Sequence, residues 1–565
     1  MVKRRKLFLL LFLFLFTACT FNSASISTSS SSTHTKYEKD EEGFLILEKD
    51  YFQSTSKKDG KEISLMKIPQ TIESKKYSSM RLYAGDQIIP IYNVKTNYAH
   101  TWNPTAPQRM NNAVAIIELK GTMTFKLQTN FLINNTCAIS PLNAKVPFSL
   151  DEERRVITFT ISSPGQYTIE FRSEKTLHLF VNEYEAYDSY KNKDNVLYFG
   201  PGVHNKENSS YIQNDNYIHL SSNTIVYLEL GAIIEGGFIA YKSNNITIVG
   251  SGIIDGAPFV RDANTNERMI PYDFSYCSDL TFLGVTNLDP AGWCYNLYFS
   301  NKINIDQVKI ISSRSNGDGI SLQSCQNVIV TNSFVRAWDD ALVVKNYPKW
   351  DNLISYGTTK NITFENCIIW NDLAQSMEIG YETYGEVLED ITFNNIVVLH
   401  NFHKAVISIH NGNQAEIKRI KFENITIEDA SMGKGDGLPY LLDFTTTFSS
   451  TWSTGHGVTS LGNIQEVYVK NIKVIDERKT MKFHLEGSID TRKEYYGSIH
   501  EIENIYFEDI EIAGTKLTAN SPRILKNEYV KNVICSSKLN NVIGAKWNPF
   551  YDSSIYGNEY YVEIA

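Results

Sequence analysis

A chain of 565 residues exceeds what one ordinary hydrophobic core organises, so two folded units or one elongated repeat protein are expected. Its hydrophobic fraction of 42% and charged fraction of 21% are typical of a globular protein and exclude a disordered chain. The formal net charge of −9 argues against a general nucleic-acid binder, so no nucleic-acid partner is expected.

Residues 1–19 have the pattern of an export signal. Basic residues at 3–6 precede the apolar run LFLLLFLFLF and the small-residue sequence TAC, and the run is too short to span a bilayer comfortably. FTAC resembles a bacterial lipobox in which Phe16 replaces the usual Leu. We therefore predict an exported lipoprotein anchored in the periplasm or at the cell surface through a lipidated Cys19, with simple secretion as the alternative. Residues 20–58, rich in Ser and Thr and then in charge, are predicted to form a flexible linker.

Residues 59–185 have the pattern of a small β domain. Segments such as AVAIIELKG, RRVITFTIS and GQYTIEFRS alternate apolar and polar residues and are separated by turns. This alternation predicts an antiparallel β-sandwich.

From residue 221 onwards a short β-branched phrase recurs, as in SNNITIVGS, SNKINIDQV, CQNVIVTNS and TKNITFENC. Irregular steps of 21 residues or more, with insertions between the phrases, are typical of a β-solenoid whose coils stack about 4.8 Å apart. We predict such a solenoid over residues 186–565. The shared aliphatic residue of each phrase is predicted to form one column: Ile225, Ile246, Leu280, Ile303, Val328, Ile362, Ile391, Ile420, Val467 and Ile505.

Asparagines recur beside these phrases. Because Asn tolerates left-handed turns and stacked amides can bond to one another, we interpret them as structural rather than ligand-binding. The residues are Asn327, Asn361, Asn424 and Asn504.

Three aspartates stand out within this repeat. DGISL at Asp318 and DALVV at Asp340 align with an offset of 22 residues, which places Asp318 and Asp340 on neighbouring coils with Asp339 beside them. Carboxylates about 5 Å apart at the backbone repel each other and raise at least one pKa, a cost that a purely structural role does not explain. Both Asp339 and Asp340 can face one cleft if a turn or bulge lies there. The same column is predicted to contain Asn296, Ser376 and Lys404.

The chain resembles the parallel β-helix glycoside hydrolases of the polygalacturonase type, glycoside hydrolase family 28, and the related family 49 of dextranases and isopullulanases. The resemblance rests on NGDG at 316–319, WDDALVVKN at 338–346, ITIVGSGIIDG at 246–256 and LYFGPGVH at 197–204. It implies a right-handed parallel β-helix, preceded here by the sandwich, and inverting hydrolysis of an α-linked, pectic polysaccharide. Asp339 would be the general acid, and Asp318 and Asp340 would hold and deprotonate water. A polysaccharide substrate, no cofactor, no metal and a monomer are expected.

The chain departs from the polygalacturonase pattern on the following coils. Where that family carries G-H-G, this chain reads QSMEIGYET, with Glu378 and Tyr381. We interpret the G-H-G at 455–457 as a coincidental loop and KGDG at 434–437 as a turn. The family's R-I-K motif, which holds a substrate carboxylate, has no literal copy at the expected place, so a family 49-like glucan hydrolase is the alternative.

Residues near the aspartates are predicted to bind substrate. The candidates are Lys404, Trp338, Asn296, Lys345, Glu378 and His410. Further aromatic residues could line sugar subsites. They are Trp293, Tyr295, Tyr347, Trp350, Trp370 and Tyr381.

Two other functions remain open at this stage. A polysaccharide lyase would use the aspartates to hold Ca²⁺, and a non-catalytic carbohydrate-binding solenoid would use the same surface without chemistry. The six cysteines beyond Cys19 form no CxxC pair, which argues against zinc, and we interpret Cys277 and Cys325 as core fillers.

Overall fold

The computed structural model describes residues 37–52, 64–98, 107–133, 137–171, 175–262, 264–347, 357–430, 438–455, 457–477, 480–536 and 562–563. Cys19, Trp350, His456 and residues 434–437 lie outside the described residues. Within this part of the chain, no helix is long and apolar enough to cross a membrane.

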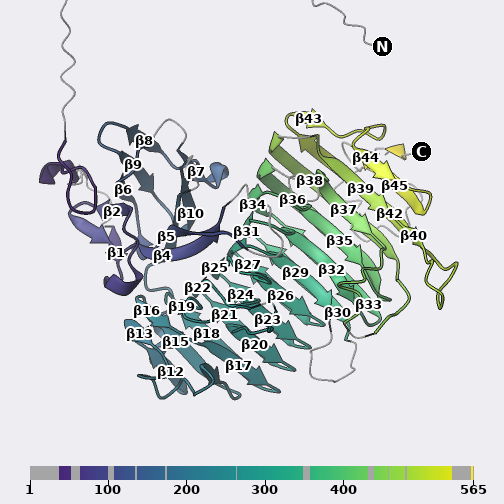
Figure 1. The fold of residues 1–565 in the computed structure, drawn as a ribbon, viewed down its shortest axis with the longest axis horizontal. Coiled ribbons are helices and arrows are strands. Elements are labelled where there is room, and N and C mark those ends of the chain that lie inside the picture. The colour runs from purple at the N-terminus through teal and green to yellow at the C-terminus, as the bar shows by residue number, and fades with distance from the viewer. Residues whose placement is uncertain are drawn as a thin grey trace, which may run out of the picture.

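A β-sandwich of two sheets precedes a right-handed parallel β-helix, and in Figure 1 the two lie side by side. One sandwich sheet contains β1 (Leu65–Lys67), β4 (Tyr92–Asn97), β5 (Arg109–Lys120), β7 (Ala138–Ser140), β10 (Gly165–Glu170) and β11 (Thr176–Glu183). The other contains β2 (Met80–Ala84), β3 (Gln87–Ile89), β6 (Met123–Thr129), β8 (Phe148–Asp151) and β9 (Val156–Ile161). Neighbouring strands are antiparallel except β5 and β11, which pair in parallel.

The β-helix has three ladders of parallel strands, because each coil contributes one strand to each ladder and turns between them. Ladder one contains β12 (Val196–Phe199), β15 (Ile225–Leu228), β18 (Asn244–Gly250), β21 (Ser278–Leu283), β24 (Asn301–Asp306), β27 (Gln326–Thr331), β30 (Thr359–Glu365), β33 (Val387–Asn394), β36 (Glu416–Ala430), β38 (Ile464–Glu477), β42 (Ile502–Ile512) and β45 (Val530–Ser536). Ladder two contains β13 (Gly202–His204), β16 (Ala232–Ile234), β19 (Ile253–Asp255), β22 (Thr286–Leu288), β25 (Lys309–Ile311), β28 (Phe334–Ala337), β31 (Ile368–Asn371) and β34 (Val397–Asn401), and continues into the long strands β36, β38 and β42.

Ladder three contains β14 (Tyr217–His219), β17 (Gly237–Tyr241), β20 (Tyr272–Ser275), β23 (Tyr295–Tyr298), β26 (Ile320–Gln323), β29 (Leu342–Asn346), β32 (Met377–Thr383), β35 (Ile407–Asn411), β37 (Tyr440–Thr445), β39 (Lys482–Glu486) and β44 (Ile524–Lys526). The remaining short elements are the 3-10 helices η1 (Lys49–Phe52), η2 (Glu73–Lys75), η3 (Leu142–Ala144) and η4 (Asp188–Tyr190), and the strands β40 (Ser488–Ile489), β41 (Ile499–His500), β43 (Thr515–Lys516) and β46 (Val562–Glu563).

The predicted aliphatic column is confirmed from Ile246 to Ile505, since each member pairs with the next on ladder one. Its first member is wrong by one residue, because Ile225 pairs with Thr247 rather than Ile246. The column faces a continuous apolar interior, which also contains Cys277 and Cys325 as predicted.

The asparagines stack as predicted. Asn361 donates from Nδ2 to Oδ1 of Asn327 at 3.0 Å, and both have left-handed backbones, with φ of 56° and 54°. Asn532 bonds in the same way to Asn504, at 2.9 Å. An Asn at these turns thus adopts the left-handed backbone conformation readily, and its side chain forms a hydrogen bond to the coil beside it.

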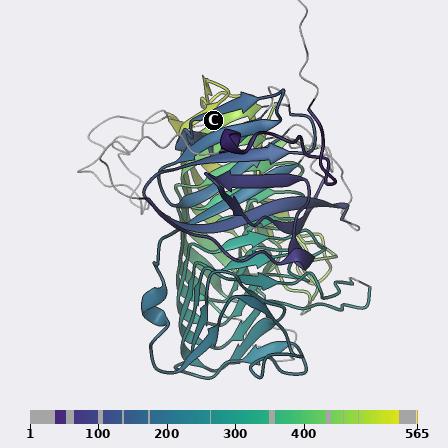
Figure 2. The ribbon, with the colours of Figure 1, turned by 90° about the vertical axis from the view of Figure 1, so that its left-hand side faces the viewer.

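The sandwich packs against the outer face of ladder two, and in Figure 2 it lies in front of the coils. The apolar contact joins Tyr92, Val94, Val114, Ile116 and Phe180 of the sandwich to Ile233, Ile253, Leu288, Ile311, Phe334 and Trp370 of the helix. Trp370 therefore packs in this interface rather than in a sugar subsite. The Arg336 guanidinium also lies over its ring, 4.0 Å from the ring centroid.

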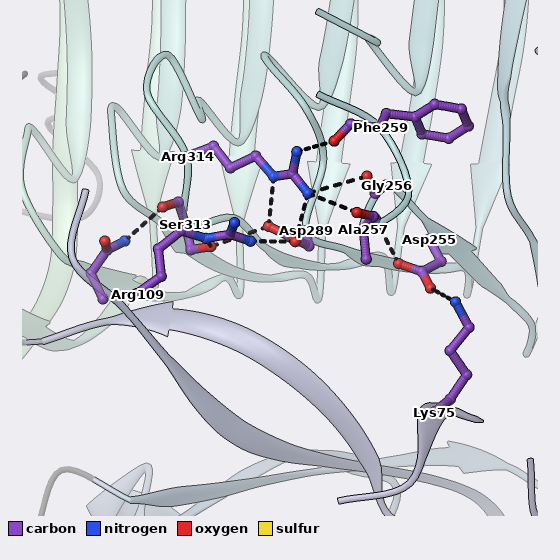
Figure 3. A network of polar contacts seen from close by, with 10 residues as sticks. Lys75, Arg109, Asp255, Gly256, Ala257, Phe259, Asp289, Ser313 and Arg314 are labelled. Atoms are coloured by element: carbon purple, nitrogen blue, oxygen red, sulfur yellow. Dashed lines mark hydrogen bonds and ion pairs between the residues drawn. The ribbon is translucent and has the colours of Figure 1, made fainter. Parts of the chain in front are cut away.

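A polar network at the same interface, which we call the interface cluster, is centred on Asp289 (Figure 3). Arg314 donates from Nη2 to Oδ2 of Asp289 at 2.9 Å and from Nε to Oδ1 at 3.0 Å, while Arg109 of the sandwich binds Oδ2. Nearby, Lys75 of the sandwich pairs with Asp255 at 2.6 Å. Two arginines on one carboxylate offset the cost of burying it.

Candidate active site

A cavity of about 810 Å³ lies over the turns between ladders two and three. It is lined by Pro107, Arg261, Asp262, Asn264, Trp293, Ser315, Asn316, Asp318, Trp338, Asp339, Asp340, Lys345, Leu373, Ala374, Gln375, Glu378, Tyr381, Glu382, Lys404 and Trp452. We call it the aspartate cavity. Successive coils contribute to it because each one turns from ladder two into ladder three at the same place, and Pro107 comes from the segment before sandwich strand β5.

The NGDG turn positions Asp318 through its neighbours. Asn316 has a left-handed backbone with φ of 53°, which Asn tolerates well. A Cβ on Gly317 would lie 2.0 Å from Oγ of Ser312, and one on Gly319 would lie 2.4 Å from the Ala341 carbonyl oxygen, so both glycines are required by close packing. The turn conformation and the close packing around it thus account for Asn316, Gly317 and Gly319 of the motif.

Asp339 and Asp340 lie in a bend between β28 and β29, outside any strand, as the expected turn requires. The Asp340 amide donates to Oδ1 of Asp339 at 3.2 Å, and the Gln375 amide donates to Oδ1 of Asp340 at 3.2 Å. Asn371 donates from Nδ2 to the Asp339 carbonyl oxygen at 2.7 Å. These bonds fix both aspartates at the cavity wall.

The 22-residue offset between Asp318 and Asp340 is confirmed, because β26 pairs with β29 in that register, with Ile320 opposite Leu342. The rest of the predicted column is wrong by a few residues, because insertions shift the register of the other coils. Asn296 pairs with Ser321, not with Asp318. Extending the registers beyond the strand ends places Trp293, Gln375 and Ala405, rather than Asn296, Ser376 and Lys404, in line with the two aspartates.

The predicted substrate-binding residues separate into two groups. Trp338, Lys345, Glu378 and Lys404 line the cavity, and their part in binding remains a prediction. Asn296 and His410 are buried behind it: Asn296 accepts from Gln323 Nε2 at 2.7 Å, and His410 contacts Glu378. Of the other aromatics, Trp293 and Tyr381 line the cavity, whereas Tyr295 is in the core and stacks on Tyr272 with ring centroids 4.1 Å apart.

The electrostatics of the three aspartates are strongly coupled. Burial, followed by the charge of Asp339, raises the pKa values of Asp318 and Asp340 well above the ordinary range, and burial also raises the pKa of Asp339. The Lys345 ammonium opposes these shifts, at 3.8 Å from Asp318 Oδ2 and 3.3 Å from Glu382 Oε2. Each of the three carboxyls therefore keeps its proton to higher pH than an isolated aspartate does.

Behind Glu378, carboxylates and imidazoles alternate across four coils. Glu378 Oε1 lies 2.8 Å from Nδ1 of His410, whose Nε2 lies 3.2 Å from Asp443 Oδ2. Asp443 Oδ1 lies 2.8 Å from Nδ1 of His484. Burial lowers the pKa of His410, but the Glu378 charge and the hydrogen bonds to Glu378 and Asp443 outweigh it and raise the pKa well above the ordinary range. This arrangement fixes Glu378 at the cavity wall, and its Oε2 has no hydrogen-bond partner among the described residues.

Several lining residues escaped sequence reasoning. Gln375 and Glu382 lie within the stretch QSMEIGYET, but neither belongs to a recognisable motif. Arg261 and Trp452 come from insertions far from the aspartates in sequence; Arg261 donates from Nε to the Ser315 carbonyl oxygen at 3.1 Å. Within the described residues, no group of three or more His, Cys, Asp or Glu side chains is arranged to hold a metal ion.

Residues 207–435 match the model of glycosyl hydrolases family 28. A "Probable endopolygalacturonase D" of Neosartorya fischeri is 22% identical over 304 residues, which cover 49% of this chain and 57% of that protein, so the chain spans little more than half of this relative. A "Dextranase" of Talaromyces minioluteus is 35% identical over 80 residues, 13% of each chain.

A solved structure, "Dex49A from Penicillium minioluteum", is similar with a TM-score of 0.55 and 15% sequence identity, over 84% of this chain and 97% of that one. At this identity the likeness concerns the fold, and it extends across both the sandwich and the coils. The family match covers the coils that carry Asp318, Asp339 and Asp340. Over residues 207–435 the chain is therefore similar to glycosyl hydrolases family 28, and its fold is shared with Dex49A.

Proposed function

We propose that this protein hydrolyses an α-linked polysaccharide with inversion at the anomeric carbon. Asp339 acts as the general acid, and Asp318 and Asp340 hold and deprotonate the attacking water. The observation that carries the proposal is the meeting of these three buried or half-buried carboxylates at one cavity wall, on neighbouring coils. The match to family 28 supports the same roles.

The chemistry needs one carboxyl that keeps its proton and others that release theirs. Burial and mutual repulsion favour protonation, whereas Lys345 favours ionisation of the carboxylates around it. All three carboxyl groups therefore keep protons to higher pH than isolated aspartates, and the Lys345 charge favours the ionised form that a base requires. Inversion further requires room for a water between acid and base, which a cavity of about 810 Å³ can provide.

A pectic substrate is the first candidate, supported by the family match and by the endopolygalacturonase relative. A neutral α-glucan is the second candidate, supported by the charge of the cavity. Its lining contains more acids than bases: Asp262, Asp318, Asp339, Asp340, Glu378 and Glu382 against Arg261, Lys345 and Lys404. Lys345 is already engaged by Asp318 and Glu382, so it is less available to bind an anionic chain. The dextranase relative supports the same alternative.

A reducing-end assay on the full chain tests the proposal, with polygalacturonan, rhamnogalacturonan, dextran, pullulan and α-1,3-glucan as substrates. We expect release of reducing ends from one of these classes, with the product anomer inverted when NMR spectra are recorded before mutarotation. Chelator should leave the rate unchanged. Retention of configuration would contradict the mechanism, and unsaturated products lost on chelation would instead indicate a lyase.

A further inference from the structure

A smaller cavity of about 200 Å³ adjoins the aspartate cavity, and we call it the side pocket. The two share lining residues, so they form one continuous recess. The shared residues are Arg261, Trp293, Asn316, Glu382 and Trp452. The side pocket adds Arg268, Tyr347 and Gly455 among others.

Trp452 reaches both cavities from an insertion between β37 and β38, residues 446–463 without the undescribed 456. Its side chain is 49% exposed, whereas the next residue, Ser453, is fully buried. Tyr384 donates from its hydroxyl to the Ser453 and Gly457 carbonyl oxygens at 3.1 and 3.2 Å, and Asn413 donates to the same Ser453 oxygen at 3.2 Å. The insertion is therefore anchored on the coils, and it presents its indole to solvent.

Glycines at the contact confirm close packing. A Cβ on Gly412 would lie 2.5 Å from the Ser453 Oγ, and one on Gly455 would lie 2.8 Å from the Tyr347 hydroxyl oxygen. Gly455 begins the G-H-G sequence that we interpreted as a coincidental loop. Its local role is to let the insertion approach Tyr347, which lines the side pocket.

The side pocket combines the groups that recognise a sugar ring. Trp293 and Trp452 contribute aromatic rings to its lining, and the Arg268 guanidinium lies over the Trp293 ring, 6.0 Å from its centroid. Asn316 and Glu382 provide polar atoms for hydroxyl groups at the shared wall. Aromatic surfaces with a few fixed polar groups are typical of small-ligand sites.

We propose that the side pocket is a second sugar subsite, which takes a pyranose unit of the polysaccharide whose scissile bond lies at the aspartates. Trp452 stacks on that unit and so determines how much longer oligosaccharides are preferred over short ones. This inference rests on the proposed function.

The test compares kcat/KM across isomalto-oligosaccharides and oligogalacturonides of increasing length, from dimer to hexamer, for the full chain and for Trp452→Ala. We expect wild-type kcat/KM to rise with length, and the variant to lose about tenfold on the longest oligomer, the order of one ring contact. The shortest oligomer that is cleaved should be affected less than twofold. Trp452→Phe keeps a ring and should retain most of the length preference.

Two matched controls separate stacking from general damage. Val458→Ala changes an exposed residue of the same insertion, and Tyr496→Ala removes an exposed aromatic outside both cavities, with exposed fractions of 48% and 79%. Both should keep the wild-type length dependence. The subsite is refuted if wild type cleaves a series and Trp452→Ala leaves its length dependence unchanged. If wild type cleaves neither these oligomers nor the five polysaccharides above, the proposed function itself fails.

Discussion

The interface cluster and the aspartate cavity each bury one carboxylate to the same depth, but they surround it with different charges. The Asp289 and Asp318 side chains are 4% and 3% exposed. Asp289 is bonded by two arginines, with Arg314 at 2.9 Å, whereas Asp318 has Lys345 at 3.8 Å and further acids around it. In one region the carboxylate charge is compensated by two arginines, whereas in the other the acids outnumber the cations beside them.

The difference separates a structural from a chemical use of the same side chain. The compensated ion pairs join the sandwich to the coils, and removing one partner destabilises the protein. Uncompensated acids cost folding free energy, and a protein retains them where raised pKa values serve a reaction. Variants that neutralise one acid at a time should therefore have opposite effects in the two regions.

Asp339→Asn should produce the largest change. Removal of the general acid is expected to lower kcat by about 10³-fold or more on a substrate with a poor leaving group. The fold should be kept, because the fold already favours the neutral form of Asp339, whose pKa is raised, and Asn is neutral at every pH. Reducing-end assays and thermal melts measure both effects. A variant that kept most of its activity would show that another residue donates the proton.

Asp289→Asn and Asp318→Asn form a matched pair for stability. Asp289→Asn leaves Arg109 and Arg314 uncompensated and should cost about 3–5 kcal/mol in unfolding free energy. Asn also tolerates the left-handed φ of 50° at this position, so the loss reports on charge.

Asp318→Asn should instead stabilise the protein near neutral pH. The folded-state pKa of Asp318 is raised, so wild type loses stability as pH rises from the unfolded pKa through the folded one, and the variant does not. Urea unfolding at pH 4 and pH 8 should show a gain that grows with pH. A loss at pH 8 similar to that of Asp289→Asn would remove the distinction between the two regions.

Lys345→Met should change the pH profile more than the maximal rate. The Lys345 charge lowers the pKa values of all three aspartates, so its removal raises them and leaves less ionised base at acidic pH. We expect kcat/KM to fall about tenfold at pH 5 and less at pH 8, as for a shift of the acidic limb. An equal loss at every pH would indicate direct contact with substrate instead.

Much of the fold was predictable because it repeats. The ladder-one column from Ile246 to Ile505 and the asparagine stacks follow from local alternation and turn preferences. The alignment of Asp318 with Asp340 was predictable for the same reason, since β26 and β29 are separated by a single coil without an insertion. Across longer insertions the predicted register was wrong. On the next coil Gln375, rather than Ser376, is in line with Asp340, because spacing alone does not reveal where an insertion begins.

The sequence by itself thus determined the coil, its register over uninterrupted turns, and the two aspartate turns, whose glycines and Asn316 encode their own backbone shape. Only the tertiary structure decided what surrounds them. Pro107 arrives with the sandwich and Trp452 with a distant insertion, and His410 turns inward to Glu378. Such neighbours depend on packing between segments far apart in the chain, and that packing leaves no periodic signal in the sequence.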